Sequence, residues 1–181
     1  MKKIDNFDQV PEPSTGLKPG GYIVQILGVE DDPKKECLKL SYDIVEGPFK
    51  DYYRGLYKQF NFWGGNFWRS YKETALSMFK GFIVSVEKSN KGFTWNWDEQ
   101  ALKGLKLGVV MGEEEYIPKG GYHAGEVRTK LVVSKVVEVE KIKNGDYKVP
   151  ELKKLPEDKR PKATSNDGAM DLSIDSDDLP F

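Results

Sequence analysis

The sequence of 181 residues contains almost no cysteine or histidine, with one of each. The single cysteine, Cys37, excludes an internal disulfide framework. One cysteine and one histidine also cannot supply the ligands of a Cys/His zinc site within one chain. No stretch approaches the roughly 20 apolar residues that span a bilayer. The first eight residues include lysines but no apolar run, so we expect no signal peptide and predict a soluble intracellular protein.

Motifs of known catalytic chemistry are also missing. The chain has no Gly-x-x-x-x-Gly-Lys-Ser/Thr phosphate loop. A nucleophilic pair would have to join Cys37 to His123, and we expect these residues at a strand start and in a glycine-rich loop. We therefore predict a protein that is not an enzyme and uses no cofactor or metal. The alternative is a metal-dependent nuclease or resolvase acting on DNA, with Asp43 and Glu46 as scattered acidic candidates.

Charge is unevenly distributed, although the net charge is only −1. Residues 49–97 hold eight basic residues against three acidic ones, and they contain 15 of the 22 aromatic residues, including all four tryptophans. After Lys162 the chain has five aspartates and no basic residue. Basic and aromatic side chains are therefore concentrated together, and acidic side chains gather after them.

Apolar patterning predicts a mainly β chain. Five segments alternate with period two or are rich in β-branched and aromatic residues, which is typical of strands. These segments are residues 22–29, 38–45, 56–63, 106–117 and 126–140. Gly28 interrupts the first of them, which indicates a bulge or a sharp bend.

Two further elements are expected between the third and fourth strands. Residues 67–79 carry apolar side chains at helical spacing after Asn66, a residue suited to cap a helix N-terminus. Residues 82–87 and 93–97 are expected to pair as an inserted hairpin. Three strands, a helix, an insert and two strands are the element order of a five-stranded Greek-key OB barrel, a fold that often binds oligonucleotides or oligosaccharides. A small β-sandwich is the structural alternative.

The same patterning divides the chain into three parts. Residues 1–20 are polar and proline-containing, and we expect an N-terminal arm. Residues 21–149 form the predicted OB domain. Residues 150–181 have few large apolar side chains, so burial cannot offset the entropy of ordering them, and we expect a disordered acidic tail.

The basic and aromatic segment predicts a nucleic-acid interface. Proteins bind single strands with a basic groove along the backbone and with aromatic faces on which bases stack. The residues that we predict to bind nucleic acid are Tyr52, Tyr53, Arg54, Tyr57, Lys58, Trp63, Arg69, Lys72, Lys91, Trp95 and Trp97.

Not every aromatic side chain in this segment is expected at the surface, because aromatic residues usually fill cores. The large apolar residues that we expect in the core are Phe60, Phe62, Phe67, Trp68, Met78 and Phe79. We expect at least two of four others to be exposed, because they share predicted strand faces that do not resemble a core: Tyr57, Trp63, Trp95 and Trp97.

The end of the sequence has the most specific pattern. Its last residues include Asp175, Asp177 and Asp178, followed by Leu179, Pro180 and Phe181. This end closely resembles the acidic C-terminal tip of bacterial single-stranded-DNA-binding proteins, which typically finish with aspartates, an aliphatic residue, Pro and Phe. It departs only in having Leu179 where Ile is usual. The resemblance implies that these six residues bind partner proteins, whereas a merely solubilising tail would explain the aspartates but not the Pro-Phe end.

More loosely, the body resembles a family of phage-encoded proteins of about this length found among replication and recombination functions. Gly20-Gly21-Tyr22 and the stretch from Leu38 to Gly47 carry this resemblance. It implies a phage single-strand-binding protein in the cytoplasm of a bacterial host. We therefore expect non-enzymatic, largely sequence-independent binding of single-stranded DNA, with the tip recruiting replication, recombination or repair proteins. A carbohydrate- or peptide-binding barrel is a third reading, which would leave the tip unexplained.

Overall fold

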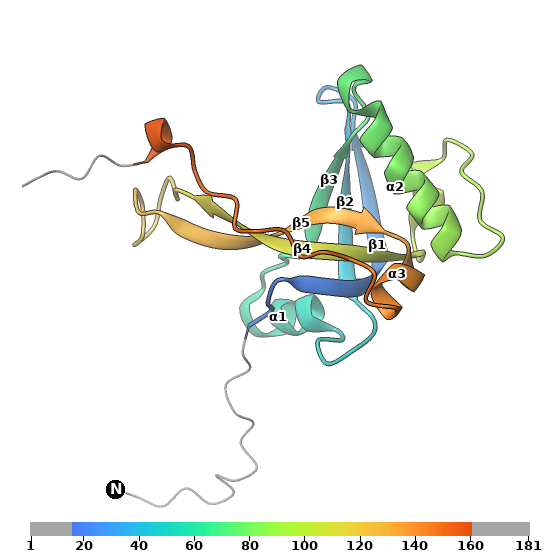
Figure 1. The fold of residues 1–181 in the computed structure, drawn as a ribbon, viewed down its shortest axis with the longest axis horizontal. Coiled ribbons are helices and arrows are strands. Elements are labelled where there is room, and N and C mark those ends of the chain that lie inside the picture. Colours follow the sequence, from blue (N-terminus) through green and yellow to red (C-terminus); the bar gives the residue numbers. More distant parts are fainter. Residues whose placement is uncertain (1–15, 161–181) are drawn as a thin grey trace, which may run out of the picture.

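The computed structural model describes residues 16–160 and is mainly β, with an open five-stranded antiparallel sheet and a few helices (Figure 1). The elements follow one another as β1 (Gly20–Asp32), β2 (Cys37–Ile44), α1 (Tyr52–Phe60), β3 (Asn66–Ser70), α2 (Leu76–Ser89), β4 (Lys106–Tyr116), β5 (Arg128–Val137) and α3 (Val139–Lys143). Short 3-10 turns lie at Glu73–Ala75, Glu99–Leu102 and Glu157–Lys159. Most of the predicted N-terminal arm and all of the predicted partner-binding tip lie outside the described residues.

The strands are ordered β3-β2-β1-β4-β5 in the sheet. Three consecutive strands lie side by side, and β4 returns beside β1, which is the Greek-key arrangement. Within residues 16–160 the outer strands β3 and β5 do not pair with each other, so the sheet is open between them. The β4–β5 hairpin projects beyond the body of the sheet (Figure 1).

The core forms on one face of the sheet, where α2 covers it. Strand β2 has the alternation expected from its sequence, since Leu38, Leu40 and Tyr42 are all buried. The predicted bulge in β1 is confirmed, because the pairing of β1 with β2 shifts between Ile26 and Gly28. Helix α2 buries residues at the spacing of one helical face: Phe79, Phe82, Ile83 and Val86.

Three predicted elements between β2 and β4 are wrong. Residues 56–63 lie in α1 and the loop after it rather than in a strand, and residues 67–70 belong to β3 rather than to a helix. Residues 82–87 lie inside α2, and residues 93–97 are irregular, so the inserted hairpin is absent from the described residues.

The physical reason is that short aromatic runs fit both a strand and a helix. The apolar side chains of the α1 region that pack on the core recur at helical spacing: Phe49, Tyr52, Tyr53 and Leu56. Packing of these side chains outweighs the strand preference of aromatic residues, which depends strongly on context. In β3, Phe67 faces the core while Trp68 faces solvent, the alternation of a strand.

Residues 150–160 lie along β4, where we expected the tail to begin. Lys153 donates its backbone N–H to the carbonyl of Glu113 at 3.0 Å and accepts from the N–H of Glu115 at 2.9 Å. The Glu115 carboxylate also pairs with Arg160. The folded body therefore extends to residue 160, beyond the predicted boundary at 149.

Candidate nucleic-acid interface

Helix α1 is held against the sheet by a buried carboxylate. Asp43, on β2, is 1% exposed, and its Oδ1 accepts hydrogen bonds from the backbone N–H groups of Ile44 at 2.9 Å and Tyr53 at 3.0 Å. Its Oδ2 accepts from the N–H of Arg54 at 3.1 Å. Two of these donors belong to the first turn of α1, whose N–H groups have no partner within the helix. Asp43, a candidate acid of the nuclease alternative, thus has a structural role.

The chain after α1 approaches β2 so closely that it needs glycine. A Cβ on Gly65 would lie 2.3 Å from the carbonyl oxygen of Tyr42 and 2.8 Å from the ring of Tyr53. The Gly65 carbonyl accepts a hydrogen bond from Trp63 Nε1 at 3.1 Å, which fixes that indole beside the glycine. The sequence Trp63-Gly64-Gly65 therefore positions the aromatic side chains at the start of β3.

A surface of aromatic side chains results, and we name it the α1–β3 aromatic surface. Four of its five members are at least half exposed: Tyr57 (50%), Phe60 (63%), Phe62 (61%) and Trp68 (57%). The fifth, Trp63, is half-buried, and its ring lies 6.3 Å from that of Tyr57 in an edge-on arrangement. Exposed aromatic rings at this density are unusual on a soluble protein and are suited to stack on bases.

A groove of about 560 Å³ lies between the free edges of β3 and β5, and we name it the β3–β5 groove. Phe62, Trp63 and Trp68 line one side of it, together with Arg69. Lys130 lines the other side, where it pairs with Glu114 at 3.0 Å. The opening of the sheet therefore places aromatic side chains and cations along one depression.

Arg69 is the most distinctive residue of this groove. Its guanidinium carbon lies 4.8 Å from the ring centroid of Phe67, and its Nη1 donates to the carbonyl of Trp68 at 3.0 Å. Burial lowers the pKa of Arg69 to about 10, so the side chain remains charged at neutral pH. Within residues 16–160 no carboxylate pairs with it. A half-buried cation without an anionic partner is a costly arrangement that a bound anion would relieve.

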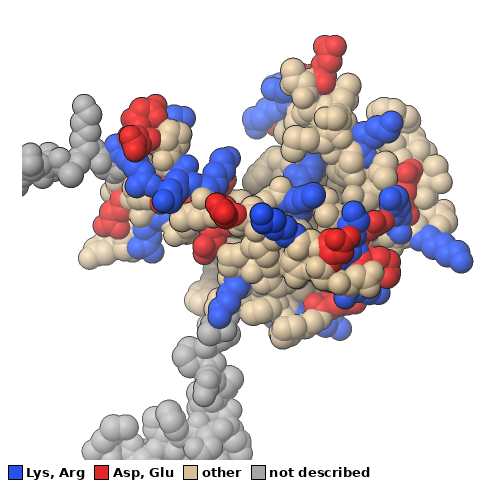
Figure 2. Space-filling view, viewed as in Figure 1, with Lys and Arg blue, Asp and Glu red and all other residues tan. Residues whose placement is uncertain are grey.

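Arg69 also lines a second depression of about 720 Å³, the α2–β5 groove. The other cations that line it are Lys88, Lys135, Lys141 and Lys148. Two acidic residues are present, Glu138 and Asp146, and Glu138 lies 3.7 Å from Lys88. On the face seen in Figure 2, Lys and Arg are interspersed with Asp and Glu.

The predicted binding residues of α1 divide into exposed and buried ones. Tyr57 and Lys58 are exposed, and Arg54 is exposed but pairs with Asp51 at 2.9 Å. Tyr52 is half-buried and packs on the core. Tyr53 is 8% exposed, so its prediction as a stacking residue is wrong; burial raises the pKa of its hydroxyl.

The remaining predicted residues do not all join this site. Lys72 and Lys91 are exposed but line neither groove. Trp95 and Trp97 lie in the loop after α2 and line a separate hollow that shares no residue with either groove. Of the four aromatic residues from which we expected at least two exposed stacking residues, Tyr57 and Trp97 are exposed, and their stacking on bases stays a prediction.

Sequence reasoning missed three exposed aromatic residues. Phe60, Phe62 and Trp68 were expected in the core, as was Met78, which is 68% exposed. Only Phe67 and Phe79 of that set are buried. The alternation of Phe67 with Trp68 would have predicted that Trp68 is exposed, but only if residues 66–70 had first been recognised as a strand.

Comparison with protein-family models and with curated proteins finds no match for this chain. In the part of the chain that the structure describes, no group of three or more His, Cys, Asp or Glu side chains is placed to hold a metal ion. None of the described helices is both long and apolar enough to cross a membrane.

Proposed function

We propose that this protein binds single-stranded DNA without cleaving it and largely without regard to sequence. The proposal rests on the position of Arg69, which lines both the aromatic β3–β5 groove and the basic α2–β5 groove. This half-buried cation has no carboxylate partner among the described residues. Nucleic acid supplies both groups that this arrangement lacks, namely phosphates for the cation and base faces for the exposed rings.

In this proposal the bases stack on Phe62 and Trp68, whose rings are more than half exposed. Each stacked base contributes about 1–3 kcal/mol of binding free energy, and every base has a face to stack, so sequence matters little. A phosphate accepts hydrogen bonds from Arg69. The strand then continues into the α2–β5 groove, where Lys135 and Lys148 have no carboxylate partner among residues 16–160.

The fold supports this proposal through its topology. The order β3-β2-β1-β4-β5, with α2 between β3 and β4, is that of an OB barrel opened between β3 and β5. We propose that the sheet is such a partly open barrel, a fold that binds oligonucleotides across its surface. The gap between β3 and β5 then admits the single-stranded DNA.

The proposal extends to the end of the chain, which lies outside the described residues. The ring of Phe181 suits an apolar pocket on a partner protein. Asp175, Asp177 and Asp178 suit a basic rim around such a pocket. In a phage replication or recombination setting, the body would coat single-stranded DNA and the tip would recruit replication or repair proteins.

One titration tests the central claim. Tryptophan emission is followed while oligo-dT, duplex DNA or an oligosaccharide is added at several salt concentrations. We expect oligo-dT to bind more tightly than duplex, and binding to weaken with salt with a slope of about −0.7 per phosphate neutralised. Equal affinity for duplex, preference for the oligosaccharide, or metal-dependent cleavage of the DNA would each reject the proposal.

A further inference from the structure

The hollow lined by Trp95 and Trp97 is chemically unlike the two grooves. It lies near the loop end of β1 and β2, has a volume of about 260 Å³, and shares no lining residue with either groove. Its lining consists of Asp31, Leu38, Tyr71, Leu76, Phe79, Trp95, Trp97 and Glu99. Half of these residues are aromatic, two are acidic, and none is basic.

The aromatic rings of the hollow form a connected set. The rings of Trp95 and Trp97 have centroids 6.2 Å apart, and Trp95 lies 6.4 Å from Phe79. Phe79 lies 6.1 Å from Tyr71 on its other side. Trp95 is fixed by a hydrogen bond from its backbone N–H to the Glu87 carboxylate at 2.9 Å. The hollow is therefore walled by the packed rings of Tyr71, Phe79 and Trp95, with the exposed Trp97 at its rim.

Trp97 is held in a strained conformation at the rim. Its backbone φ is 67°, in the left-handed region that bulky residues rarely adopt. Its indole is nevertheless 83% exposed, so no burial of the ring offsets this strain. Strained residues of this kind cluster at binding sites, where the surrounding structure imposes the conformation.

The charge of the hollow is negative. Within the described residues neither Asp31 nor Glu99 pairs with a Lys or Arg, since Lys35 pairs with Asp32 and Lys39 pairs with Glu30. Asp31 accepts a hydrogen bond from the Tyr71 hydroxyl at 2.8 Å. Hydrogen bonds from its own backbone N–H and from the Gln100 side chain lower the pKa of Glu99, so this carboxylate is ionised at neutral pH.

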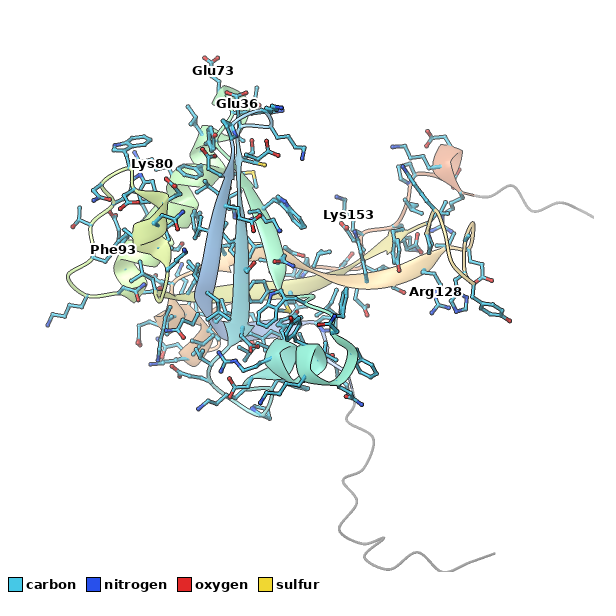
Figure 3. All side chains as sticks on the ribbon, turned by 180° about the vertical axis from the view of Figure 1, so that it is seen from behind. Glu36, Glu73, Lys80, Phe93, Arg128 and Lys153 are labelled. Carbon is cyan, nitrogen blue, oxygen red and sulfur yellow. The ribbon has the colours of Figure 1, made fainter. Side chains whose placement is uncertain are left out.

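The surroundings of the hollow add further carboxylates. Glu36 and Glu73 lie at the same end of the molecule, near the turn between β1 and β2 (Figure 3). The Tyr71 backbone N–H donates to the carbonyl of Glu36 at 2.9 Å, which places Glu36 beside the wall of the hollow. A phosphate in the hollow would meet two carboxylates and no cation among the lining residues, so the hollow disfavours nucleic acid although Trp95 and Trp97 were predicted to bind it.

We propose that this hollow binds the guanidinium group of an arginine side chain presented by a partner protein. A cation is attracted to the face of an aromatic ring, most strongly to tryptophan. A guanidinium is planar, stacks on such rings and pairs with carboxylates through several N–H donors. The hollow supplies indole rings from Trp95 and Trp97 and unpaired carboxylates from Asp31 and Glu99. This partner site is additional to the proposed nucleic-acid interface and does not depend on it.

The test uses the full chain and a matched pair of peptides. The capped tripeptide Gly-Arg-Gly is titrated while the indole N–H signals of the four tryptophans are followed by NMR. The same peptide with citrulline in place of arginine has nearly the same shape but no charge. We expect saturable shifts of the Trp95 and Trp97 signals with the arginine peptide and none with the citrulline peptide.

Variants locate the site. Trp97→Gly removes the indole and relieves the positive φ, so it should leave folding intact while abolishing the shift of Trp95. Glu99→Gln and Asp31→Asn should each weaken arginine-peptide binding by about threefold, as expected for an exposed ion pair. Tyr122→Ala, which removes an exposed aromatic ring that lines neither the hollow nor either groove, is the matched control and should leave the shifts of the Trp95 and Trp97 signals unchanged.

Two results would overturn the proposal. One is an equal response to the arginine and citrulline peptides, which would show an apolar contact rather than a cation site. The other is that oligo-dT shifts the Trp97 signal and binds more tightly to Glu99→Gln, which would assign the hollow to nucleic acid. Failure of oligo-dT to bind anywhere would reject the proposed function and leave the arginine result unaffected.

Discussion

The buried carboxylate of Asp43 on β2 accepts the backbone N–H of Tyr53 in the first turn of α1, at 3.0 Å. This hydrogen bond connects the sheet to the helix that carries Tyr57 and Phe60 of the α1–β3 aromatic surface. A negative charge at a helix N-terminus is also favoured by the helix dipole. The part of the aromatic surface that lies on α1 is thus held to the sheet by a buried acidic residue.

Replacement of Asp43 should therefore affect both stability and binding. Asp43→Ala leaves three buried N–H donors with weaker or no partners, and we expect the free energy of unfolding to fall by roughly 2–4 kcal/mol. Denaturation by urea measures this loss. Glu46→Ala is the control, because Glu46 is partly exposed and pairs with Lys106 at 2.9 Å, so its removal should cost less than about 1 kcal/mol. Equal effects of the two substitutions would contradict the role of Asp43.

Substitutions at two neighbouring residues of β3, Phe67 and Trp68, should have different effects on DNA binding and on stability. Trp68→Ala should weaken oligo-dT binding by about 1–3 kcal/mol, because its exposed ring is available to stack on a base. Its thermal midpoint should stay near that of the unsubstituted chain, since the ring is 57% exposed. Phe67→Ala, at a residue 4% exposed, should instead cost about 3–5 kcal/mol of stability. A Trp68 variant that unfolds would show that this ring supports the fold.

Arg69 should govern affinity for single strands and its dependence on salt. Arg69→Ala loses one phosphate contact, so the slope of log affinity against log salt concentration should become shallower by about 0.7. It should not lower the free energy of unfolding substantially, because it removes a half-buried charge that has no partner among the described residues. Arg69→Lys keeps the charge but loses the planar group over Phe67, so it should restore binding only in part.

The α2–β5 groove can be tested with lysines of matched exposure. Lys135→Gln should lower the salt slope of oligo-dT binding by a similar amount, about 0.7. Lys119→Gln is the control, because Lys119 is exposed in the β4–β5 loop and lines neither groove. If the two variants behave alike, the effect is one of net charge and the strand does not follow the α2–β5 groove.

Tyr71 should titrate at unusually high pH. The hydrogen bond to Asp31 raises the pKa of Tyr71 to about 12. The folded pKa lies above the unfolded value of about 10, so the stabilisation is complete below pH 10 and declines as the pH rises toward 12. The difference in tyrosinate absorbance between the unsubstituted chain and Tyr71→Phe isolates this group, and Asp31→Asn should move its titration toward about 10.

Removal of Phe181 tests the resemblance of the chain's end to a partner-binding tip. The deletion leaves all five aspartates after Lys162 in place, so we expect oligo-dT affinity to be unchanged. Binding to a bacterial protein that docks such tips should be lost, because the ring of Phe181 is the proposed anchor. Pull-down with immobilised full-length chain measures this, and a deletion without effect would leave the end as a solvated acidic segment.

The sequence by itself determined the elements whose pattern extends over many residues. The alternation of β2 specifies a strand, because a period of two over eight residues is incompatible with a helix. In β1, β4 and β5, short stretches rich in β-branched residues indicate strands. The turn residues between them, and the bulge at Gly28, were predictable for the same local reason.

Only the tertiary structure decided the region between β2 and β4, which carries the candidate site. Its aromatic residues are so dense that strand and helix patterns both match, and the choice depends on which rings the sheet can bury. In α1, a helix allows Tyr53 to be buried beside Gly65. In β3, the alternation of a strand leaves Trp68 exposed. The surroundings of Arg69 likewise include residues of β4 and β5 that are distant in the sequence, and local patterning contains no information about such contacts.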